Sequence, residues 1–400
     1  MTKRLYITLL LMLPLMAGAQ SVRLTNYKAP TALYFNFEHL FNYNLYEHCR
    51  WGAGFTWVTP NEYAANPREF LGQWILQGYT AYGVFDRQWK YGGSAMLRRR
   101  GQYDFTFFAG GKHDVEHAAT RKMEPYLLTS PDDNAGYLAS RFSMANTVYG
   151  GISWKPAPRW VGHASLCYSH ETPLFDSTGC LYPTDDALPP VCRYLDLNVW
   201  FDVNLTANRR QAPESKLTIH LTGGLAEMEN AYLRALAQYS WGKAYEDFHL
   251  WCQAGYVTPQ VAYSRLFDLS GTGGTPYYFN HSFLTVPPLQ FTADLFAHLC
   301  IRYTAPLPLW ELSFSKPKPF LQLNMLWGEL IGNDNTCGIA LAAPSRGLAE
   351  PATGFDGLFR WGFLDMGFAI AYRLTPPLAD YQPENPLDSF GFAIVARLIV

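Results

Sequence analysis

Apolar and polar residues alternate along much of this chain. In the clearest segment, residues 195–205, the odd positions are apolar and the even positions carry Asp, Asn and Trp. Residues 215–226 repeat the alternation, with Leu217, Ile219 and Leu221 set against Thr218 and His220. Because successive side chains of a strand point to opposite faces, each segment predicts a strand with one apolar and one polar face. Soluble β-sandwiches and transmembrane β-barrels both use such strands.

The alternation predicts about 12 to 16 strands, with about 14 the best value. Most of the segments are long enough to cross a membrane at a tilt, which takes roughly 9 to 11 residues. The predicted strands are 46–58, 69–85, 88–99, 102–111, 147–155, 159–170, 193–206, 215–226, 231–242, 247–257, 290–304, 320–330, 363–374 and 389–400.

The start of the chain has the pattern of a secretion signal. Lys3 and Arg4 precede a short apolar run, and Ala17-Gly18-Ala19 is typical of a cleavage site. We therefore expect a signal peptide over 1–19, a lead-in over 20–45 and a barrel over 46–400. No later apolar run is long enough for a membrane-spanning helix.

Composition favours the barrel over the soluble alternative. Aromatic residues make up 16% of the chain, and charged residues also make up 16%, below the roughly 25% of soluble domains. An exported, strand-rich chain without a membrane helix can satisfy its backbone in lipid by closing its sheet. The predicted fold class is therefore all-β, an antiparallel transmembrane β-barrel. The net charge of −2 argues against nucleic acid as a partner.

The predicted connections differ in length. Asp86-Arg87 and Arg100-Gly101 are tight turns, whereas 113–146, 171–191, 265–289 and 332–349 are long and polar. Such barrels have short periplasmic turns and longer outer loops. If 46–58 runs outward, however, 113–146 falls on the periplasmic side. Either a strand is missing from the count, or this segment folds inward, with room for one short helix over 135–144.

Several short motifs, taken in order, resemble a family of outer-membrane barrels of unknown function that usually follows a carboxypeptidase-regulatory-like β-sandwich. The motifs are Asn44–Glu47 with Arg50–Gly52, Gly78–Gly83, Asp86–Gly92, His113–Glu116 with Asp133-Asn134, Gly255–Pro259, Phe291 with Asp294, and Glu350 with Gly354–Asp356. The resemblance implies an outer-membrane location and no established activity. We expect no β-sandwich in this chain, so a separate periplasmic partner is a further possibility.

Charged residues on the polar faces of the predicted strands are nearly balanced in sign. The candidates for residues that face the lumen are Asp196, Asp202, His220, Arg234, Asp294, His298, Arg302, Asp365 and Arg373. The other charged residues predicted to lie on the polar faces are Arg50, Lys90, Arg98, Lys216, Arg397, Asp104 and Asp247. A pore selective for one ion sign would show rings of one sign. Opposite charges in a low-dielectric wall instead pair with one another. We therefore expect a largely occluded lumen, with a narrow channel or transporter as the alternative.

Candidate chemistry is sparse. Cys180 and Cys192 flank one long connection and can close it as a disulfide, and no cysteine pair has metal-ligand spacing. Ser169-His170 and His281-Ser282 suggest a barrel-embedded lipid hydrolase, but adjacent residues of a regular strand point to opposite faces. We expect no catalytic, cofactor or metal site, and a hydrolase stays a minor alternative.

The last predicted strand alternates Phe390, Phe392, Ile394, Leu398 and Val400. This is the pattern of a closing strand, which the outer-membrane assembly machinery reads during insertion, although the terminal residue is Val rather than an aromatic residue. The sequence thus predicts an integral outer-membrane protein of structural, surface or assembly-accessory type, with outer-membrane lipid and the assembly machinery as its partners.

Overall fold

A computed structural model describes residues 22–24, 32–36, 41–44, 48–59, 72–99, 104–117, 142–157, 159–174, 192–206, 214–242, 247–259, 261–269, 271, 281–286, 291–332, 341–361, 364–374 and 389–398. The chain divides into two compact units. The first comprises 1–117, 124–201 and 222–231, and the second comprises 118–123, 202–221 and 232–400. The expected signal peptide over 1–19 lies outside the described residues.

The first unit is a run of antiparallel hairpins. Three short strands come first, β1 (Val22–Leu24), β2 (Ala32–Asn36) and β3 (Phe41–Asn44). The long strands that follow are β4 (His48–Val58), β5 (Gln73–Gly83), β6 (Trp89–Arg99), β7 (Asp104–His117), β8 (Phe142–Ala157), β9 (Trp160–Pro173) and β10 (Cys192–Asn204), the last of which extends beyond this unit. From β4 to β9 each strand pairs with the next along the chain.

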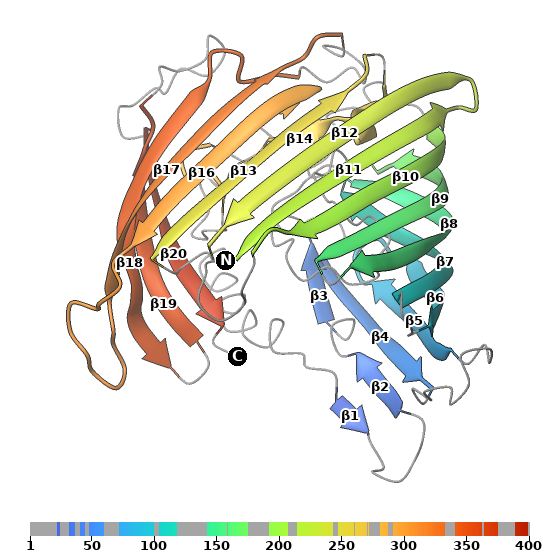
Figure 1. Cartoon of the computed structure of the whole chain (residues 1–400), viewed down its shortest axis with the longest axis horizontal. Coiled ribbons are helices and arrows are strands. Elements are labelled where there is room, and N and C mark those ends of the chain that lie inside the picture. The colour runs from blue at the N-terminus through green and yellow to red at the C-terminus, as the bar shows by residue number, and fades with distance from the viewer. Residues whose placement is uncertain are drawn as a thin grey trace. The chain divides into compact units, whose positions relative to one another are not determined.

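The second unit continues the same pattern, and Figure 1 shows its strands in the order of the chain. Its long strands are β11 (Ser215–Ala226), β12 (Asn230–Trp241), β13 (Phe248–Val257), β16 (Leu295–Thr304), β17 (Lys318–Glu329), β18 (Leu348–Trp361), β19 (Leu364–Tyr372) and β20 (Phe390–Leu398); parts of β11 and β12 belong to the first unit. A 3₁₀ turn, η4 (Tyr263–Arg265), and a small sheet of β14 (Phe267–Asp268) and β15 (Thr292–Ala293) lie between β13 and β16.

The strand count is higher than the best value from sequence. β2 pairs with residues 54–58 of β4, and β3 pairs with residues 48–51 of the same strand, so β2 and β3 act as one interrupted strand. Counted in this way, and with the three-residue β1 set aside, the described residues form an antiparallel sheet of 16 strands, within the predicted range. The two that sequence missed are this interrupted strand and β18. Both β2 and β3 fall within the segment 20–45, which we expected to be a lead-in to the barrel.

The interrupted strand also removes the difficulty over 113–146. With one more strand at the start, β4 is the second strand rather than the first, so β7 ends on the outer side if the first strand runs outward. β7 extends to His117 and β8 begins at Phe142, so the connection is 118–141. Residues 142–144 belong to a strand rather than to the suggested helix, and 135–141 lie outside the described residues. In the first unit, β7 and β9 end at the edge of the sheet opposite to the edge at which β6 and β8 end.

Burial follows the predicted alternation. Along β10, Tyr194, Asp196, Asn198 and Trp200 are buried, whereas Leu197 is 54% exposed. Along β11, Thr218, His220 and Thr222 are buried and Leu221 is exposed. We call the buried side the polar face of each unit and the other side its apolar face. Large hydrophobic side chains line the apolar face, an arrangement that soluble proteins avoid over such an area.

No helix among the described residues is both long and apolar enough to cross a membrane.

Candidate functional site

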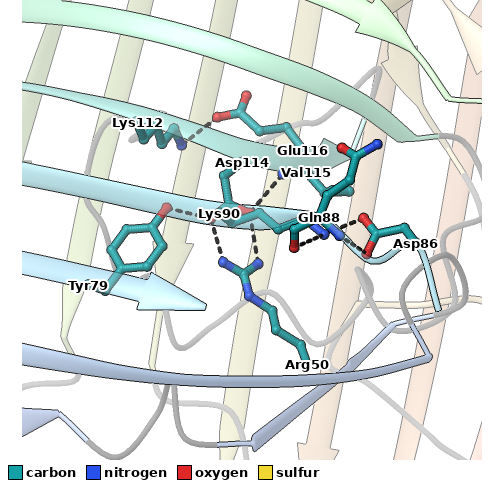
Figure 2. Close-up of polar contacts among 9 residues, drawn as sticks. All are labelled: Arg50, Tyr79, Asp86, Gln88, Lys90, Lys112, Asp114, Val115 and Glu116. Atoms are coloured by element: carbon teal, nitrogen blue, oxygen red, sulfur yellow. Dashed lines mark hydrogen bonds and ion pairs between the residues drawn. The ribbon is translucent and has the colours of Figure 1, made fainter. Parts of the chain in front are cut away.

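A buried charge network occupies the polar face of the first unit. Arg50 on β4 donates two hydrogen bonds to the carboxylate of Asp114 on β7, at 2.7 and 2.8 Å. The Tyr79 hydroxyl on β5 donates to the same carboxylate. Figure 2 shows both side chains pointing toward Asp114 from neighbouring strands. A bidentate arginine–carboxylate pair is the strongest geometry for such a contact.

A glycine lets this network reach across a strand. Tyr79 and Asp114 are separated by β6, where Gly92 lies opposite Tyr79. A Cβ at Gly92 would lie 2.6 Å from the Tyr79 ring. The absent side chain therefore leaves room for the ring to lie across β6 and contact β7.

Two further ion pairs flank the network. Lys112 pairs with Glu116, and Lys90 pairs with Asp86, as Figure 2 shows. Lys90 is fully buried, and its ammonium group also donates to the Gln88 carbonyl at 3.3 Å. Arg50, Lys90 and Lys112 thus each face a carboxylate, which is the requirement for burying charge at a tolerable cost.

The second unit holds a comparable pair on its polar face. Arg302 on β16 donates to Asp356 on β18 at 2.6 Å and to Gln322 on β17 at 3.2 Å. Its guanidinium carbon lies 3.7 Å from the centre of the Phe320 ring. The predicted inward residue Arg302 is therefore held by a charge, an amide and an aromatic ring.

The described parts of the connection between β13 and β16, namely 258–259, 261–269, 271, 281–286 and 291–294, pack against this same face. Val261, Leu266 and Phe267 of its first part are buried, as are Phe283 and Leu284 of its second part. Sequence placed 265–289 among the outer loops, and the structure corrects this, because its apolar side chains are covered by the sheet. Phe291, near the end of the connection, is buried as well.

Glu350 on β18 is the main polar anchor of the β13–β16 connection. Its carboxylate accepts the Leu284 N–H at 2.9 Å, the Thr285 N–H at 2.8 Å and the Thr285 hydroxyl at 2.6 Å. Glu350 itself has no exposed surface. Leu284 completes the contact by packing in a cluster with Phe320 and with small residues of β18, β19 and β20, namely Ala352, Ala369, Ala371 and Ala393.

Other strands hold the connection at further points. Arg234 on β12 donates from Nε to the Arg265 carbonyl at 3.2 Å, and its guanidinium carbon lies 4.3 Å from the centre of the Phe267 ring. Asn324 on β17 donates to the Ser282 carbonyl at 2.9 Å. The predicted inward residue Arg234 thus contacts the connection rather than an open space.

Aromatic and imidazole rings stack between the connection and the sheet. The His281 ring stacks on Trp251 of β13 with centroids 4.2 Å apart. The Phe283 ring stacks on His298 of β16 at 5.0 Å, and Trp251 meets His298 edge-on at 4.9 Å. His298, the central residue of the predicted inward set, is therefore enclosed by aromatic rings.

The remaining predicted inward residues lie at several separate points. Asp294 is fully buried and accepts the Ile331 N–H at 2.7 Å and the Gly332 N–H at 3.3 Å. Asp365 pairs with Arg360 at 3.3 Å. Asp202 is only partly buried and contacts Thr218 and Lys216. Asp196 and His220 are buried in their strands, and Arg373, the residue after β19, is buried as well. Of the wider charge count, Lys216 and Asp247 are exposed.

Sequence reasoning missed three acids that matter most to this arrangement. Asp114, Glu350 and Asp356 all occur in the motifs that carry the family resemblance, but they were not counted as inward charges. Their positions in the sequence could have indicated inward charges. Asp114 lies within a strand-forming segment, and Glu350 and Asp356 are both at even positions of one strand, so they lie on the same face. The structure pairs two of them with Arg50 and Arg302, which were counted.

The serine, histidine and cysteine residues considered as reactive groups make the following contacts. Ser169 donates to Glu171 at 3.3 Å, and His281 stacks on Trp251. Cys180 lies outside the described residues, so its pairing with Cys192 stays a prediction. Within the described residues, no group of three His, Cys, Asp or Glu side chains is arranged to hold a metal ion. The polar faces carry buried ion pairs and, in the second unit, a covering segment.

No family model and no curated protein matches the chain. Among solved structures, the chain is similar to BamA from Haemophilus ducreyi lacking POTRA domains 1-3, with a TM-score of 0.50 at 10% identity over 92% of this chain and 70% of that one. It is also similar to CdiB from Acinetobacter baumannii, with a TM-score of 0.45 at 9% identity over 88% of this chain, and it spans only 57% of the CdiB chain. OccK11 from Pseudomonas aeruginosa is similar with a TM-score of 0.35 at 9% identity, over 91% of each chain.

The likeness to BamA bears on the fold and on nothing else. Together with the antiparallel sheet of long strands, it confirms the predicted fold class: the chain has the all-β fold of outer-membrane β-barrels. The resemblance to the barrel family that follows a carboxypeptidase-regulatory-like domain stays a prediction.

Proposed function

We propose that this protein is an integral outer-membrane β-barrel whose lumen is occluded by its own β13–β16 connection and inward ion pairs. It serves a structural, surface or assembly-accessory role, without enzymatic activity, and its partners are outer-membrane lipid and, during insertion, the barrel assembly machinery. The observation that carries the proposal is the burial of the β13–β16 connection against the polar face of the second unit.

The nature of the contacts supports occlusion over an open pore. A segment that merely rested near a channel wall would leave its polar groups to water. Here the Leu284 and Thr285 N–H groups are buried and depend on Glu350, and Phe267 and Phe283 are covered by side chains of the sheet. Removing the Glu350 carboxylate while the segment stays buried would leave these donors unpaired, at a cost of about 1–3 kcal/mol per group.

The apolar face supports the membrane location. Mid-strand residues such as Leu197, Val148 and Leu321 are more than half exposed on the face opposite the buried charges. Transmembrane barrels alternate apolar-out and polar-in along every strand in this manner. The exposed side chains would be covered by lipid.

Single-channel recording of the full-length protein in planar lipid bilayers tests the occlusion. We expect little conductance from the wild type and frequent openings from Glu350→Ala, because this substitution removes the acceptor for the Leu284 and Thr285 donors. The matched control is Glu311→Ala. Glu311 forms an exposed ion pair with Lys316 in the β16–β17 turn, away from the connection.

Two outcomes would contradict the proposal. A large, steady conductance from the wild type would overturn occlusion and favour the channel or transporter class. Recovery of the exported protein in a soluble fraction, without a heat-modifiable band in gel electrophoresis, would overturn the membrane location. The heat-modifiable band also checks that Glu350→Ala has folded before its conductance is interpreted.

A further inference from the structure

A groove of about 640 Å³ crosses the apolar face of the second unit. It is lined by side chains of β11, β12, β13, β16 and β17, and by the residues that lead into β18. Its outward-facing lining is apolar almost throughout. The groove therefore suits hydrocarbon better than a polar solute, which would need convergent hydrogen-bonding groups.

The strand register explains why the surface is hollow here. Ala237 pairs with Ala254, Ala254 pairs with Ala297, and Ala297 pairs with Trp327. Three one-carbon side chains thus form a row across neighbouring strands, and the row ends at a large indole. The neighbouring row on the same face carries bulkier residues, Tyr239, Cys252, Leu299 and Met325. The alanine row forms a floor bounded by these larger side chains.

A cation, Arg346, lies at the edge of this apolar surface. Arg346 lines the groove and is exposed, in the turn just before β18. Trp327 is tied to the same turn, because its indole N–H donates to the Ser345 carbonyl at 3.2 Å. None of the ion pairs found among the described residues involves Arg346. The guanidinium is thus positioned to meet an anion from outside the chain.

We propose that this groove binds one acyl chain of an anionic phospholipid, with the lipid phosphate paired to Arg346. The inference rests on the proposed membrane location, in which the apolar face meets lipid. A guanidinium binds phosphate through a planar pair of donors, and a tryptophan near a strand end is typical of the headgroup level. Trp327 lies near the end of β17, at the side of the sheet where the long β17–β18 connection begins.

The shape of the groove favours an acyl chain over a second copy of the protein. The strands of a neighbouring barrel would carry large side chains on their apolar face. The alanine row is only one residue wide, so it is too narrow to accommodate such a surface. Exposed apolar residues continue around the groove, among them Leu221, Leu233 and Tyr256. The groove is thus a local hollow in a surface that already faces hydrocarbon, and its selectivity comes from the charge at its edge.

Native mass spectrometry of the full-length protein tests this proposal, with phosphatidylglycerol and phosphatidylcholine of identical acyl chains as the probes. We expect the wild type to retain one phosphatidylglycerol about three- to fivefold more tightly than phosphatidylcholine, the factor expected for one partly screened ion pair. Arg346→Gln should remove this preference. Ala254→Leu with Ala297→Leu should fill the groove and abolish the retained lipid.

The matched control is Ala109→Leu, which adds the same side chain at an exposed position of β7 far from the groove in sequence. Retention of lipid by the filled variant, equal retention of the two lipids by the wild type, or a dimer mass in place of a lipid adduct would each overturn the proposal. Membrane fractionation separates this failure from that of the proposed function. A protein assembled in the outer membrane that retains no lipid overturns the groove alone.

Discussion

Replacing Arg50 by alanine should destabilise the protein strongly, because the Asp114 carboxylate would lose the bidentate cation that faces it. Both side chains are largely shielded from water, at 9% and 13% exposure. The Tyr79 hydroxyl and the Val115 N–H would remain as donors to Asp114. Neither of them supplies a positive charge, so the carboxylate would stay buried without its counterion.

The magnitude follows from how buried pairs respond to truncation. Removing one partner of a buried pair costs about 3–5 kcal/mol, whereas replacing both by apolar residues of similar volume is often neutral or stabilising by about 1–4 kcal/mol. We therefore expect a loss of about 3–5 kcal/mol for Arg50→Ala and no loss for Arg50→Met combined with Asp114→Leu. Tyr79→Phe removes one hydrogen bond to a charged group and should cost about 1.5–3 kcal/mol.

Equilibrium unfolding in denaturant, followed by tryptophan fluorescence of the protein in lipid vesicles, measures these differences. The double replacement is the internal control, since it changes the same positions without stranding a charge. If Arg50→Ala unfolds at the same denaturant concentration as the wild type, or if the double variant is the less stable of the two, then the pair does not act as a buried counterion unit.

Two further substitutions, each with a control substitution, test which face of β10 is turned to lipid and how closely β18 is packed. Leu197→Arg, at the middle of β10 and 54% exposed, should cost about 2–4 kcal/mol in vesicle refolding, while Leu374→Arg, just beyond the end of β19, should cost at most about 1 kcal/mol; equal losses would refute the facing. Gly354→Ala would place a Cβ 2.0 Å from the Phe368 carbonyl oxygen and should destabilise by about 1–3 kcal/mol, whereas Gly223→Ala, with no atom within 4 Å, should be tolerated in the same unfolding assay.

The alternation of residues was enough to predict the fold class and the faces of most strands. Asn198 and His220 are buried and Leu197 and Leu221 are exposed, as their parity requires. This success has a simple cause, because a strand between lipid and a polar interior must separate its side chains at every second position.

Two strands escaped prediction because their local sequences do not look like strands. β18 contains Pro351, Gly354 and Gly357, residues that ordinarily indicate a turn, and its register shifts between Phe355 and Phe359. The interrupted strand of β2 and β3 offers only pieces of five and four residues, too short for an alternation to stand out. In both cases pairing with a long neighbour decides the conformation.

The β13–β16 connection was the largest error in the candidate site. The Gly- and Thr-rich sequence around 270–275 is typical of an exposed loop. The same connection, however, contains several large apolar side chains that need to be covered, namely Val261, Leu266, Phe283 and Leu284. Pairing partners were equally hard to predict. Parity places a charge on a face, but only the fold decides that Arg302 meets Asp356 rather than Asp294.

The anchoring of the β13–β16 connection has a mechanical consequence. Residues of β12, β13, β16, β17 and β18 all hold it, through Arg234, Trp251, His298, Asn324 and Glu350. The connection therefore acts as a cross-brace over several strands, in addition to the ladder of hydrogen bonds between neighbours. A force applied to any one of these strands therefore also acts on the connection. Under force, β12 to β18 should leave a membrane as one cooperative block rather than hairpin by hairpin.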